Sequence, residues 1–575
     1  MFETLYLKVK NFVRTTKMKI NRKKNREKDK LPKNMKYFDG GLYDAIYESS
    51  VKYPANIALE YFNTQITYKE LIRNINKVAC ALKHYDIKPG DRVTICMPNT
   101  PEAVYMFYAI NEIGAVANMV HPLSSEKEIE DCLTGSDSRM MLCIDAVYNK
   151  VKKIISNTKV EKLIVASATK STERFTAFLY WLTKGRKIKI REDEKVLLWN
   201  HFVAKASLYK GNPHAKVKPE DLALILYSGG TTGKSKGVML SNLNFNAQAI
   251  QCKYIVSDLL VPENAFLTFL PNFHAFGIGI CTHMPLYIGM RVVLIPKFEV
   301  KKLKKYIRKY KFNIICGVPT IYEYLSKLKF KKNELKCLKM VVSGGDAMNM
   351  QLKEKVDDML AKYGSPSNLR VGYGLTEASG VVSFSPNGIK ESDIIGYPFP
   401  DCDFLIKDLD KNKEVPVGEA GEILFRGATV MMGYMNNEEE TKNSFVTIHG
   451  KKWLRTGDIG FFDDKGLLHY KARLKRMIIT NGYNVYPAHV EEVIMSSGVV
   501  EKCCVAGVPH ETRGEIPKAF IVLKKDVDPS YAKSMIKDAI KEHLAKFEQP
   551  KQFAYIDDIP VTKMGKYDFR ALQKM

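Results

Sequence analysis

Residues 227–238 read Tyr-Ser-Gly-Gly-Thr-Thr-Gly-Lys-Ser-Lys-Gly-Val and come directly after an apolar stretch, Leu222–Leu226. Glycines allow backbone N–H groups to approach an anion, and hydroxyl groups donate further hydrogen bonds. Lys234 and Lys236 add positive charge to the same short segment. The sequence therefore predicts a polyphosphate-binding loop that follows a buried strand.

This loop matches a Walker A motif only at its end, where Gly233-Lys234-Ser235 occurs. The first glycine of a Walker A motif would fall at position 228, which is serine, and its lysine would open a helix. The chain instead continues through apolar residues 238–240, which predict a second strand, before Ser241 offers a helix cap. We therefore expect a phosphate loop between two strands and exclude a P-loop nucleoside triphosphatase.

Strand and helix patterns alternate from Phe266 onward, which predicts a largely parallel sheet covered by helices. A portion richer in strand patterns follows from about Ile394 to Tyr470. The predicted parallel strands are Phe266–Leu270, Val292–Ile295, Ile314–Cys316, Lys339–Val342 and Arg370–Tyr373.

The stretch 227–238 resembles the signature of the adenylate-forming ligases, which include acyl-CoA synthetases, luciferases and adenylation domains. The resemblance runs from about Leu42 to the C-terminus through at least six further blocks in the expected order. It implies an α/β fold with a large N-terminal domain, residues 41–474, in which helices cover mostly parallel sheets and a β-rich subdomain follows. A small mobile α+β lid domain would comprise residues 475–575, and residues 1–40 would form a basic leader.

The resemblance assigns nucleotide-binding roles to several blocks. The loop would hold the β- and γ-phosphates of ATP through Ser228, Gly229, Gly230, Thr231, Thr232, Gly233, Lys234 and Lys236. In the block 372–377, Tyr373 would stack on adenine, Thr376 would contact the α-phosphate, and Glu377 would ligate Mg²⁺, which prefers oxygen ligands. Gly345, in the block 343–347, would border the adenine.

Blocks nearer the C-terminus resemble the ribose site, the hinge and the catalytic loop of these ligases. Asp458 would hold both ribose hydroxyls, Arg473 would make a second ribose contact, and Lys475 would lie at the hinge. Lys566 would be the adenylation lysine, stabilising the transition state between the carboxylate and the α-phosphate, and Lys563 is the decoy in the same loop. After a swing of the lid domain, Gly482 would let coenzyme A pass close to the backbone.

The block 271–277, Pro-Asn-Phe-His-Ala-Phe-Gly, resembles that of ligases for fatty and aryl acids. Residues 276–281 contain no acidic side chain to hold a substrate ammonium, so an amino acid is disfavoured, and His274 would line the carboxylate end. Gly374, where acetate-activating members tend to carry tryptophan, would leave the acyl pocket open. An apolar pocket gains about 0.8 kcal/mol per buried methylene, which favours a medium- or long-chain fatty acid, although an aryl acid would fit the same residues.

The resulting prediction is an ATP-dependent acid–CoA ligase that uses ATP, Mg²⁺ and coenzyme A and proceeds through an acyl-adenylate. Three alternatives stay open: an acyl-AMP ligase that loads a carrier protein, a luciferase-like oxygenase, and a non-catalytic membrane-associated scaffold. Release of pyrophosphate from ATP would separate the enzymes from the scaffold. The oligomeric state is left open.

The bulk properties bear on location and partners. The chain has 575 residues, which predicts two or three domains, and its eleven cysteines show no C-x-x-C spacing, as in a reduced cytoplasmic protein. The formal charge is +26, partly from Lys8–Lys36 and partly from helices such as Lys301–Lys311 with solvated faces. Nucleic-acid binding is disfavoured, because the basic stretch lacks interleaved aromatic residues.

Two segments of the sequence are typical of contact with another surface, and a third is not typical of a membrane-spanning helix. Apolar residues recur at helical spacing in the first thirteen positions beside lysines, which predicts an amphipathic helix on the cytoplasmic face of a membrane, with an inert leader as the alternative. The lysine- and aromatic-rich stretch of about 169–196 suggests an excursion with a second surface contact. Residues 277–296 are interrupted by His283, Pro285 and Arg291, so they predict a buried helix plus strand.

Overall fold

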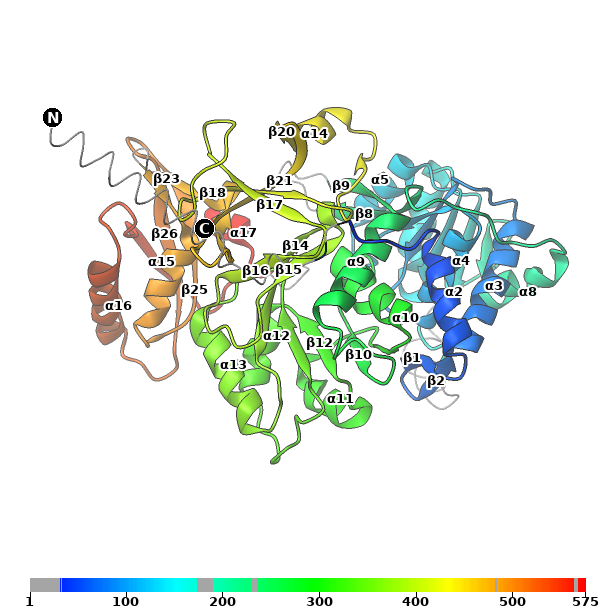
Figure 1. Cartoon of the computed structure of the whole chain (residues 1–575), viewed down its shortest axis with the longest axis horizontal. Coiled ribbons are helices and arrows are strands. Elements are labelled where there is room, and N and C mark those ends of the chain that lie inside the picture. The colour runs from blue at the N-terminus through cyan, green and yellow to red at the C-terminus, as the bar shows by residue number, and fades with distance from the viewer. Residues whose placement is uncertain (1–31, 33, 173–189, 229–234, 481–482, 563–566) are drawn as a thin grey trace.

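The computed structural model describes residue 32 and residues 34–172, 190–228, 235–480, 483–562 and 567–575, with the backbone alone at Arg570. Figure 1 shows the N-terminal elements at the right, the middle of the chain at the centre and the C-terminal elements at the left. The α/β class expected from the alternating patterns is confirmed. Most of the predicted leader and most of the excursion at 169–196 lie outside the described residues.

The first sheet has eight strands in the order β19-β9-β8-β4-β3-β5-β6-β7. Strands β3 to β8 pair in parallel, whereas β8 and β9 form an antiparallel hairpin. All residues of β4 and β5 are buried, as expected for parallel strands that are covered on both faces. The strands are β3 (Arg92–Cys96), β4 (Val116–Met119), β5 (Met140–Ile144), β6 (Lys162–Ala166), β7 (Val196–Leu198), β8 (Leu222–Ser228), β9 (Lys236–Ser241) and β19 (Gly433–Tyr434).

The second sheet has fourteen strands and changes character at β14. Strands β1, β10, β11, β12, β13 and β14 pair in parallel, and β15 onward pair antiparallel. This confirms the predicted parallel strands and the β-rich portion after residue 394. The strands are β1 (Ile57–Tyr61), β2 (Thr64–Thr67), β10 (Ala265–Thr268), β11 (Arg291–Leu294), β12 (Ile314–Gly317), β13 (Met340–Ser343), β14 (Leu369–Leu375), β15 (Gly380–Phe384), β16 (Ile394–Pro398), β17 (Asp403–Lys407), β18 (Gly421–Arg426), β20 (Phe445–Ile448), β21 (Lys451–Phe462) and β22 (Leu468–Arg473).

Helices cover both sheets, and their starts follow local capping chemistry. Thr67 and Glu70 form a capping box at α3, and Ser241 caps α9 as its sequence position predicts. The α-helices of this part are α2 (Leu42–Lys52), α3 (Tyr68–His84), α4 (Pro101–Glu112), α5 (Glu126–Ser136), α6 (Tyr148–Ile154), α8 (Trp199–Ala204), α9 (Asn242–Ile255), α10 (Met284–Ile288), α11 (Leu303–Tyr310), α12 (Pro319–Ser326), α13 (Met350–Lys362) and α14 (Glu438–Asn443).

Several short helical turns complete this part. The segment Phe276–His283, labelled η6, is a π-helix that runs into α10, and β11 follows, so the predicted buried helix plus strand is confirmed. The 3₁₀ turns are η2 (Asp145–Val147), η3 (Ile155–Asn157), η5 (Lys205–Leu208), η7 (Val300–Lys302), η8 (Thr376–Ala378) and η9 (Leu474–Arg476).

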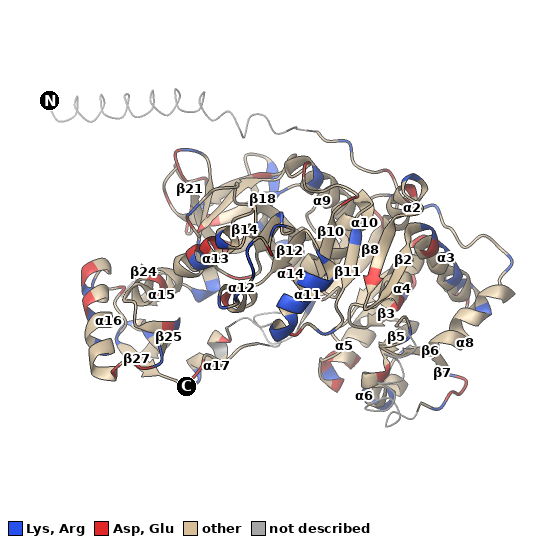
Figure 2. Cartoon of the chain, turned by 90° about the horizontal axis from the view of Figure 1, so that it is seen from below, with Lys and Arg blue, Asp and Glu red and all other residues tan. Residues whose placement is uncertain are grey.

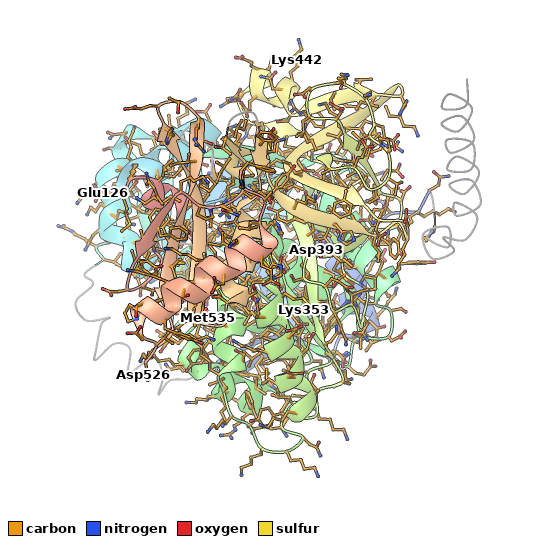
Figure 3. The ribbon with its side chains drawn as sticks, turned by 90° about the vertical axis from the view of Figure 1, so that its left-hand side faces the viewer. Glu126, Lys353, Asp393, Lys442, Asp526 and Met535 are labelled. Carbon is orange, nitrogen blue, oxygen red and sulfur yellow. The ribbon has the colours of Figure 1, made fainter. Side chains whose placement is uncertain are left out.

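Residues from β23 onward form a five-stranded sheet with helices packed against it. Its core is separate from the main one and includes Val490, Ile494, Val505 and Ile536. Figure 3 views this part with α16 in front, where Met535 packs at the edge of that core. The elements are β23 (Ile478–Thr480), β24 (Tyr483–Val485), α15 (Pro487–Ser496), β25 (Val500–His510), β26 (Gly514–Leu523), α16 (Pro529–His543), β27 (Gln552–Tyr555) and α17 (Phe569–Gln573).

Three composition-based expectations can be compared with the structure. All eleven cysteines are free thiols, and nine of them are buried. Figure 2 shows the ribbon of α11 largely in the blue of lysine and arginine, and Lys305, Arg308 and Lys309 are exposed, as expected for a solvated face. Within the described part of the chain, none of the helices combines the length and apolarity that a membrane crossing requires.

Candidate active site

The predicted phosphate loop connects β8 and β9, as the sequence predicts. Ser228, the last residue of β8, lies opposite Lys236, the first residue of β9. Residues 229–234 (Gly229, Gly230, Thr231, Thr232, Gly233 and Lys234) lie outside the described residues. The hairpin therefore brings the two ends of the loop together and leaves Ser228 and Lys236 at its base.

Tyr373, Asp458 and Arg473 form a connected cluster, although they come from three different strands. The Tyr373 hydroxyl donates a hydrogen bond to Oδ2 of Asp458 over 2.8 Å. Arg473 pairs with Asp458 in the β21–β22 register, and its Nε lies 3.1 Å from Oδ1. Burial raises the pKa of Tyr373 well above its ordinary value, and the Asp458 carboxylate raises the pKa of Arg473. Both carboxylate oxygens of the buried Asp458 thus have a protein partner.

Glu377 and Lys236 are joined through a residue that the sequence analysis did not single out, Tyr434. The Tyr434 hydroxyl donates to Oε1 of Glu377 over 3.0 Å, and Nζ of Lys236 lies 5.2 Å from the centre of the Tyr434 ring. Pairing of β9 with β19 brings Tyr434 to this place, because Tyr434 lies opposite Val238. The Lys236 ammonium also forms an ion pair with Glu440.

Thr376 and Glu377 form the short turn η8 at the end of β14. The backbone N–H of Met431 donates to the carbonyl of Glu377 over 2.9 Å, which holds this turn against the segment that leads to β19. Among the described residues, no three or more histidine, cysteine, aspartate or glutamate side chains gather as a metal site. A Mg²⁺ ion that uses phosphates and water needs only one or two carboxylates, so the single carboxylate of Glu377 fits such an ion.

Gly345 lies in the loop that connects β13 to α13. Its φ is +81°, a conformation that favours glycine. At the preceding Gly344, a Cβ atom would lie 3.2 Å from both the carbonyl oxygen of Gly372 and the ring of Phe276. The loop after β13 therefore packs closely on the block that contains Tyr373 and on the start of η6.

The structure changes the interpretation of Gly374. A Cβ atom built there would lie 1.5 Å from the carbonyl oxygen of Gly380 and 2.5 Å from its carbonyl carbon. The pairing of β14 with β15 is irregular between Tyr373 and Gly374, which presses the two backbones together. In this chain the backbone of the hairpin leaves no room for a Cβ atom, which explains the glycine without reference to the acyl pocket.

His274 lies immediately before η6, among aromatic rings. Its ring centre is 4.8 Å from that of Phe273 and 6.5 Å from that of His121, a residue that the sequence patterns did not indicate. A Cβ atom at Gly277 would lie 2.0 Å from the carbonyl oxygen of Pro271, so η6 folds directly onto the block that precedes it. π-Helical segments occur frequently at functional sites, in agreement with a role for this block.

Lys475 lies in η9, between the last strand of the second sheet and β23. The next residue, Arg476, turns to the C-terminal part, where it pairs with Glu491 at 3.0 Å and lies over the ring of Phe569. Tyr567 is largely buried, which raises its pKa, with smaller contributions from Glu323 and Asp346 of the larger part. The C-terminal part therefore lies near the loop after β13, whereas Gly482, Lys563 and Lys566 lie outside the described residues.

Tyr434, Glu440 and His121 are the site neighbours that sequence reasoning missed. Each comes close through strand pairing or packing between distant segments, such as β9 with β19. No spacing rule links Glu440 to Lys236, which are 204 residues apart. The one available signal was the glycine–tyrosine pair 433–434 before an acidic helix start, Glu438–Glu440.

Comparisons with known proteins agree with this arrangement. The sequence model of the AMP-binding enzyme family matches residues 46–435, and that of the AMP-binding enzyme C-terminal domain matches residues 489–566. A long-chain-fatty-acid–CoA ligase of Bacillus subtilis is 30% identical over 91% of this chain and 92% of its own length.

Two solved structures share the fold. One is ATP-bound MatB from Rhodopseudomonas palustris, 23% identical, with a TM-score of 0.80 over 93% of this chain and 99% of that one. The other is the anthranilate CoA ligase AuaEII in complex with anthranoyl-AMP, 23% identical, with a TM-score of 0.79 over 95% of this chain and 98% of that one. Together with the match over residues 46–435, these findings identify the chain as a member of the AMP-binding enzyme family.

Proposed function

We propose that this protein is an ATP-dependent carboxylic acid–CoA ligase that acts on a medium- or long-chain fatty acid. In the first half-reaction a carboxylate oxygen attacks the α-phosphorus of ATP, forming an acyl-adenylate and releasing pyrophosphate. In the second, the thiol of coenzyme A attacks the acyl carbon, forming the thioester and releasing AMP. Adenylation is necessary because a free carboxylate repels nucleophiles and has no good leaving group.

The observation that carries the proposal is that two groups of polar side chains lie close together. One is attached to β14 and the other to the turn that follows β14. Tyr373, with Asp458 and Arg473, offers a carboxylate and a guanidinium for a ribose. A few residues further along the same chain, Glu377 connects through Tyr434 to Lys236 at the base of the glycine-rich hairpin. A nucleotide whose ribose lies at the first cluster can direct its phosphates toward the second.

Within this proposal, each residue has a definite task. Lys236, Ser228 and the intervening loop hold the β- and γ-phosphates, and Thr376 contacts the α-phosphate. Mg²⁺ would be held by Glu377, and it would supply charge neutralisation between phosphate oxygens. Lys566 brings its ammonium between the attacking carboxylate and the α-phosphate, where it stabilises the developing charge. His274 lines the carboxylate end of the acyl site.

For the second half-reaction we propose a division of the chain at Leu474–Lys475, with Lys475 as the hinge. Rotation of residues 475–575 would replace the Lys566 loop by the segment that contains Gly482, where the pantetheine arm of coenzyme A would pass. The location of η9 between the two parts supports a pivot there. The contacts of Arg476 with Glu491 and Phe569 support its moving with the C-terminal part.

The acid class rests on the relatives and on the residues around η6. The Bacillus subtilis relative is a long-chain-fatty-acid–CoA ligase, which favours a fatty acid. The absence of acidic side chains in residues 276–281 disfavours an amino acid. An aryl acid is the second candidate, because the anthranilate CoA ligase shares the fold over almost the whole chain.

The test is pyrophosphate release by the purified protein with ATP and Mg²⁺, using acids from acetate to oleate together with benzoate and coumarate. Each acid is assayed with and without coenzyme A, and the thioester is identified by mass spectrometry. We expect a maximum among acids of eight to eighteen carbons, with a coenzyme A thioester as product. A maximum with an aryl acid would support the second candidate. Release without thioester would indicate a carrier-protein acceptor, and no release with any acid would overturn the proposal.

We also propose that the basic leader attaches the protein to the cytoplasmic face of a membrane. Its apolar residues at helical spacing and its lysines support an interfacial helix on anionic lipid. Removal of residues 1–36 should move the protein from the membrane pellet to the supernatant, while a variant with the same lysines but polar replacements of Phe2, Leu5 and Val9 should do likewise. Unchanged distribution of both variants would contradict this attachment.

A further inference from the structure

Glu440 is held rigidly at the start of α14, facing the base of the phosphate hairpin. The side chain of Asn437 caps this helix by accepting the N–H of Glu440 over 3.0 Å, and the N–H of Ser444 donates to the Glu440 carbonyl over 3.0 Å. The segment before α14 is tied to β9, because the N–H of Met435 donates to the carbonyl of Gly237 over 2.8 Å. These hydrogen bonds hold the backbone of Glu440 close to Lys236.

The ammonium of Lys236 has one carboxylate and one aromatic ring close to it. It pairs with the carboxylate of Glu440 and lies 5.2 Å from the centre of the Tyr434 ring. The side chain of Lys236 is 17% exposed and that of Glu440 is 38% exposed, so the pair lies partly shielded from water. An ion pair in such a place is screened less by salt than one on the open surface.

The neighbouring acids of the same helix turn behave differently. Glu438 and Glu439 are both exposed, and neither makes an ion pair with a described residue. Figure 1 shows α14 next to β20, above the hairpin of β8 and β9, and Figure 3 places Lys442, at the other end of α14, at the outer rim. Of the three consecutive glutamates, Glu440 is the one directed at the hairpin.

We propose that Glu440 is a resident counter-ion of Lys236 that competes with the polyphosphate of ATP and promotes the departure of pyrophosphate. This inference rests on the proposed function, in which Lys236 holds the β- and γ-phosphates. A phosphate group that binds the Lys236 ammonium brings its negative charge next to the Glu440 carboxylate. Two negative charges so close together repel each other. Binding of ATP therefore displaces Glu440 from Lys236, and Glu440 returns to the ammonium as pyrophosphate leaves.

The role assigned to Glu440 is positioning, since it acts on the ligand through Lys236. It has a selective consequence. Ligands with β- or γ-phosphates, namely ATP and pyrophosphate, compete with Glu440, whereas AMP does not reach Lys236 in the proposed arrangement. A residue that only stabilises the fold would change the affinity for all three ligands together.

The experiment measures dissociation constants of ATP, pyrophosphate and AMP by isothermal titration calorimetry on the full chain, with Mg²⁺ present. Glu440→Gln should lower the dissociation constants of ATP and pyrophosphate roughly two- to fivefold, the range expected for loss of a partly exposed ion pair, and leave that of AMP unchanged. Glu439→Gln is the matched control, because it removes the same charge one residue away on the exposed side. It should alter none of the three constants.

A second variant shows whether the effect passes through Lys236. In a Lys236→Met background, Glu440→Gln should no longer tighten ATP binding. Weaker ATP binding by Glu440→Gln, an equal change for AMP, or an equal effect of Glu439→Gln would each overturn the counter-ion role. Failure of the unmodified protein to bind ATP at all would instead overturn the proposed function, so the two failures are distinct.

Discussion

The hydroxyl of Tyr373 donates a hydrogen bond of 2.8 Å to the carboxylate of Asp458, which lies 85 residues further along the chain. This bond joins β14, at the centre of the second sheet, to β21 in its antiparallel half. Asp458 is buried, with 1% of its surface exposed, so its charge depends on the protein for hydrogen bonds. Tyr373 donates a hydrogen bond to Oδ2, and Arg473 places its positive charge beside Oδ1, with its Nε at 3.1 Å.

Tyr373→Phe should therefore destabilise the protein, because it leaves one oxygen of a buried carboxylate without its donor. We expect the free energy of unfolding to fall by about 1–3 kcal/mol. The urea midpoint, followed by tryptophan fluorescence, measures this loss. Tyr363→Phe is the control: Tyr363 is half-buried and stacks near Phe330 in an edge-on arrangement, and it should change the midpoint little. Equal midpoints for the two variants would contradict a stabilising role of the Tyr373–Asp458 bond.

Substitution of the two lysines of the C-terminal loop, Lys563 and Lys566, should affect acyl-adenylate formation very differently. Lys566→Ala should lower the rate of acyl-adenylate formation by roughly a hundred- to a thousandfold, the effect typical of removing a donor that stabilises developing charge. Lys563→Ala should leave that rate close to normal. Pyrophosphate release measures the first half-reaction, and thioester formation from synthetic acyl-adenylate measures the second. If the two variants lose the same activity in the first half-reaction, the assignment to Lys566 is wrong.

Local patterns were sufficient to predict much of the framework. The apolar stretch before Ser228, the apolar residues 238–240 and the cap at Ser241 together predicted the β8–β9 hairpin and the start of α9, as observed. These features depend on residues adjacent in sequence, whose propensities and capping bonds act over a few positions. The parallel strands from β10 to β14 were predictable for the same reason.

Contacts between distant segments were not predictable. Tyr434 reaches Glu377 and Lys236 because β19 adds to the edge of β9, and a two-residue strand leaves no periodic pattern in sequence. Gly374 illustrates a second limit. The family resemblance suggested a role in substrate choice, but in this chain the packing of its backbone on Gly380 leaves no room for a Cβ atom. Such a constraint becomes visible only when the strand register is known.

Gly374→Ala tests that constraint. A methyl group 1.5 Å from the Gly380 carbonyl oxygen cannot be accommodated without separating β14 from β15, so we expect a loss of more than about 2 kcal/mol in unfolding free energy. Gly135→Ala, within α5, is the matched control. A Cβ atom at Gly135 would have one neighbour within 4 Å, a side-chain atom of Met435 at an ordinary contact distance of 3.7 Å. That variant should be neutral or slightly more stable, since alanine favours a helix. A Gly374→Ala protein with normal stability and altered chain-length preference would instead support the open pocket.

His283 makes the stability of the protein depend on pH. It is fully buried in η6, where Tyr108 and Asn246 contact its two ring nitrogens at 3.1 and 3.0 Å. Burial lowers the pKa of His283 from 6.5 to about 3, and neither of its two ring partners supplies a negative charge, since Asn246 is neutral and Tyr108 stays protonated as burial raises its own pKa. The folded protein therefore keeps His283 neutral at a pH where the unfolded chain takes up a proton.

The direction in which the free energy of unfolding changes with pH follows from this difference in proton uptake. Above pH 6.5 both states are neutral at this position and the full stability is present, whereas between pH 6.5 and about 3 the unfolded state gains protons and stability falls. The slope contributed by this one residue approaches about 1.4 kcal/mol per pH unit below pH 6. Glu112 acts in the opposite sense, because burial raises its pKa to about 8 and its stabilising effect is lost as pH rises. The pH profile of the unmodified protein alone therefore does not isolate His283.

A comparison of the pH profiles of two variants does isolate the contribution of His283. His283→Gln keeps a polar side chain of similar reach and cannot be protonated, so its urea midpoint should fall less between pH 7 and pH 5 than that of the unmodified protein. His84→Gln, at the exposed end of α3, is the control and should keep the original slope. A His283→Gln protein that is less stable at every pH but has the original slope would show that His283 takes up its proton in the folded state over the same pH range as in the unfolded chain. A reduced slope would establish that its neutrality is imposed by burial between α4, α9 and η6.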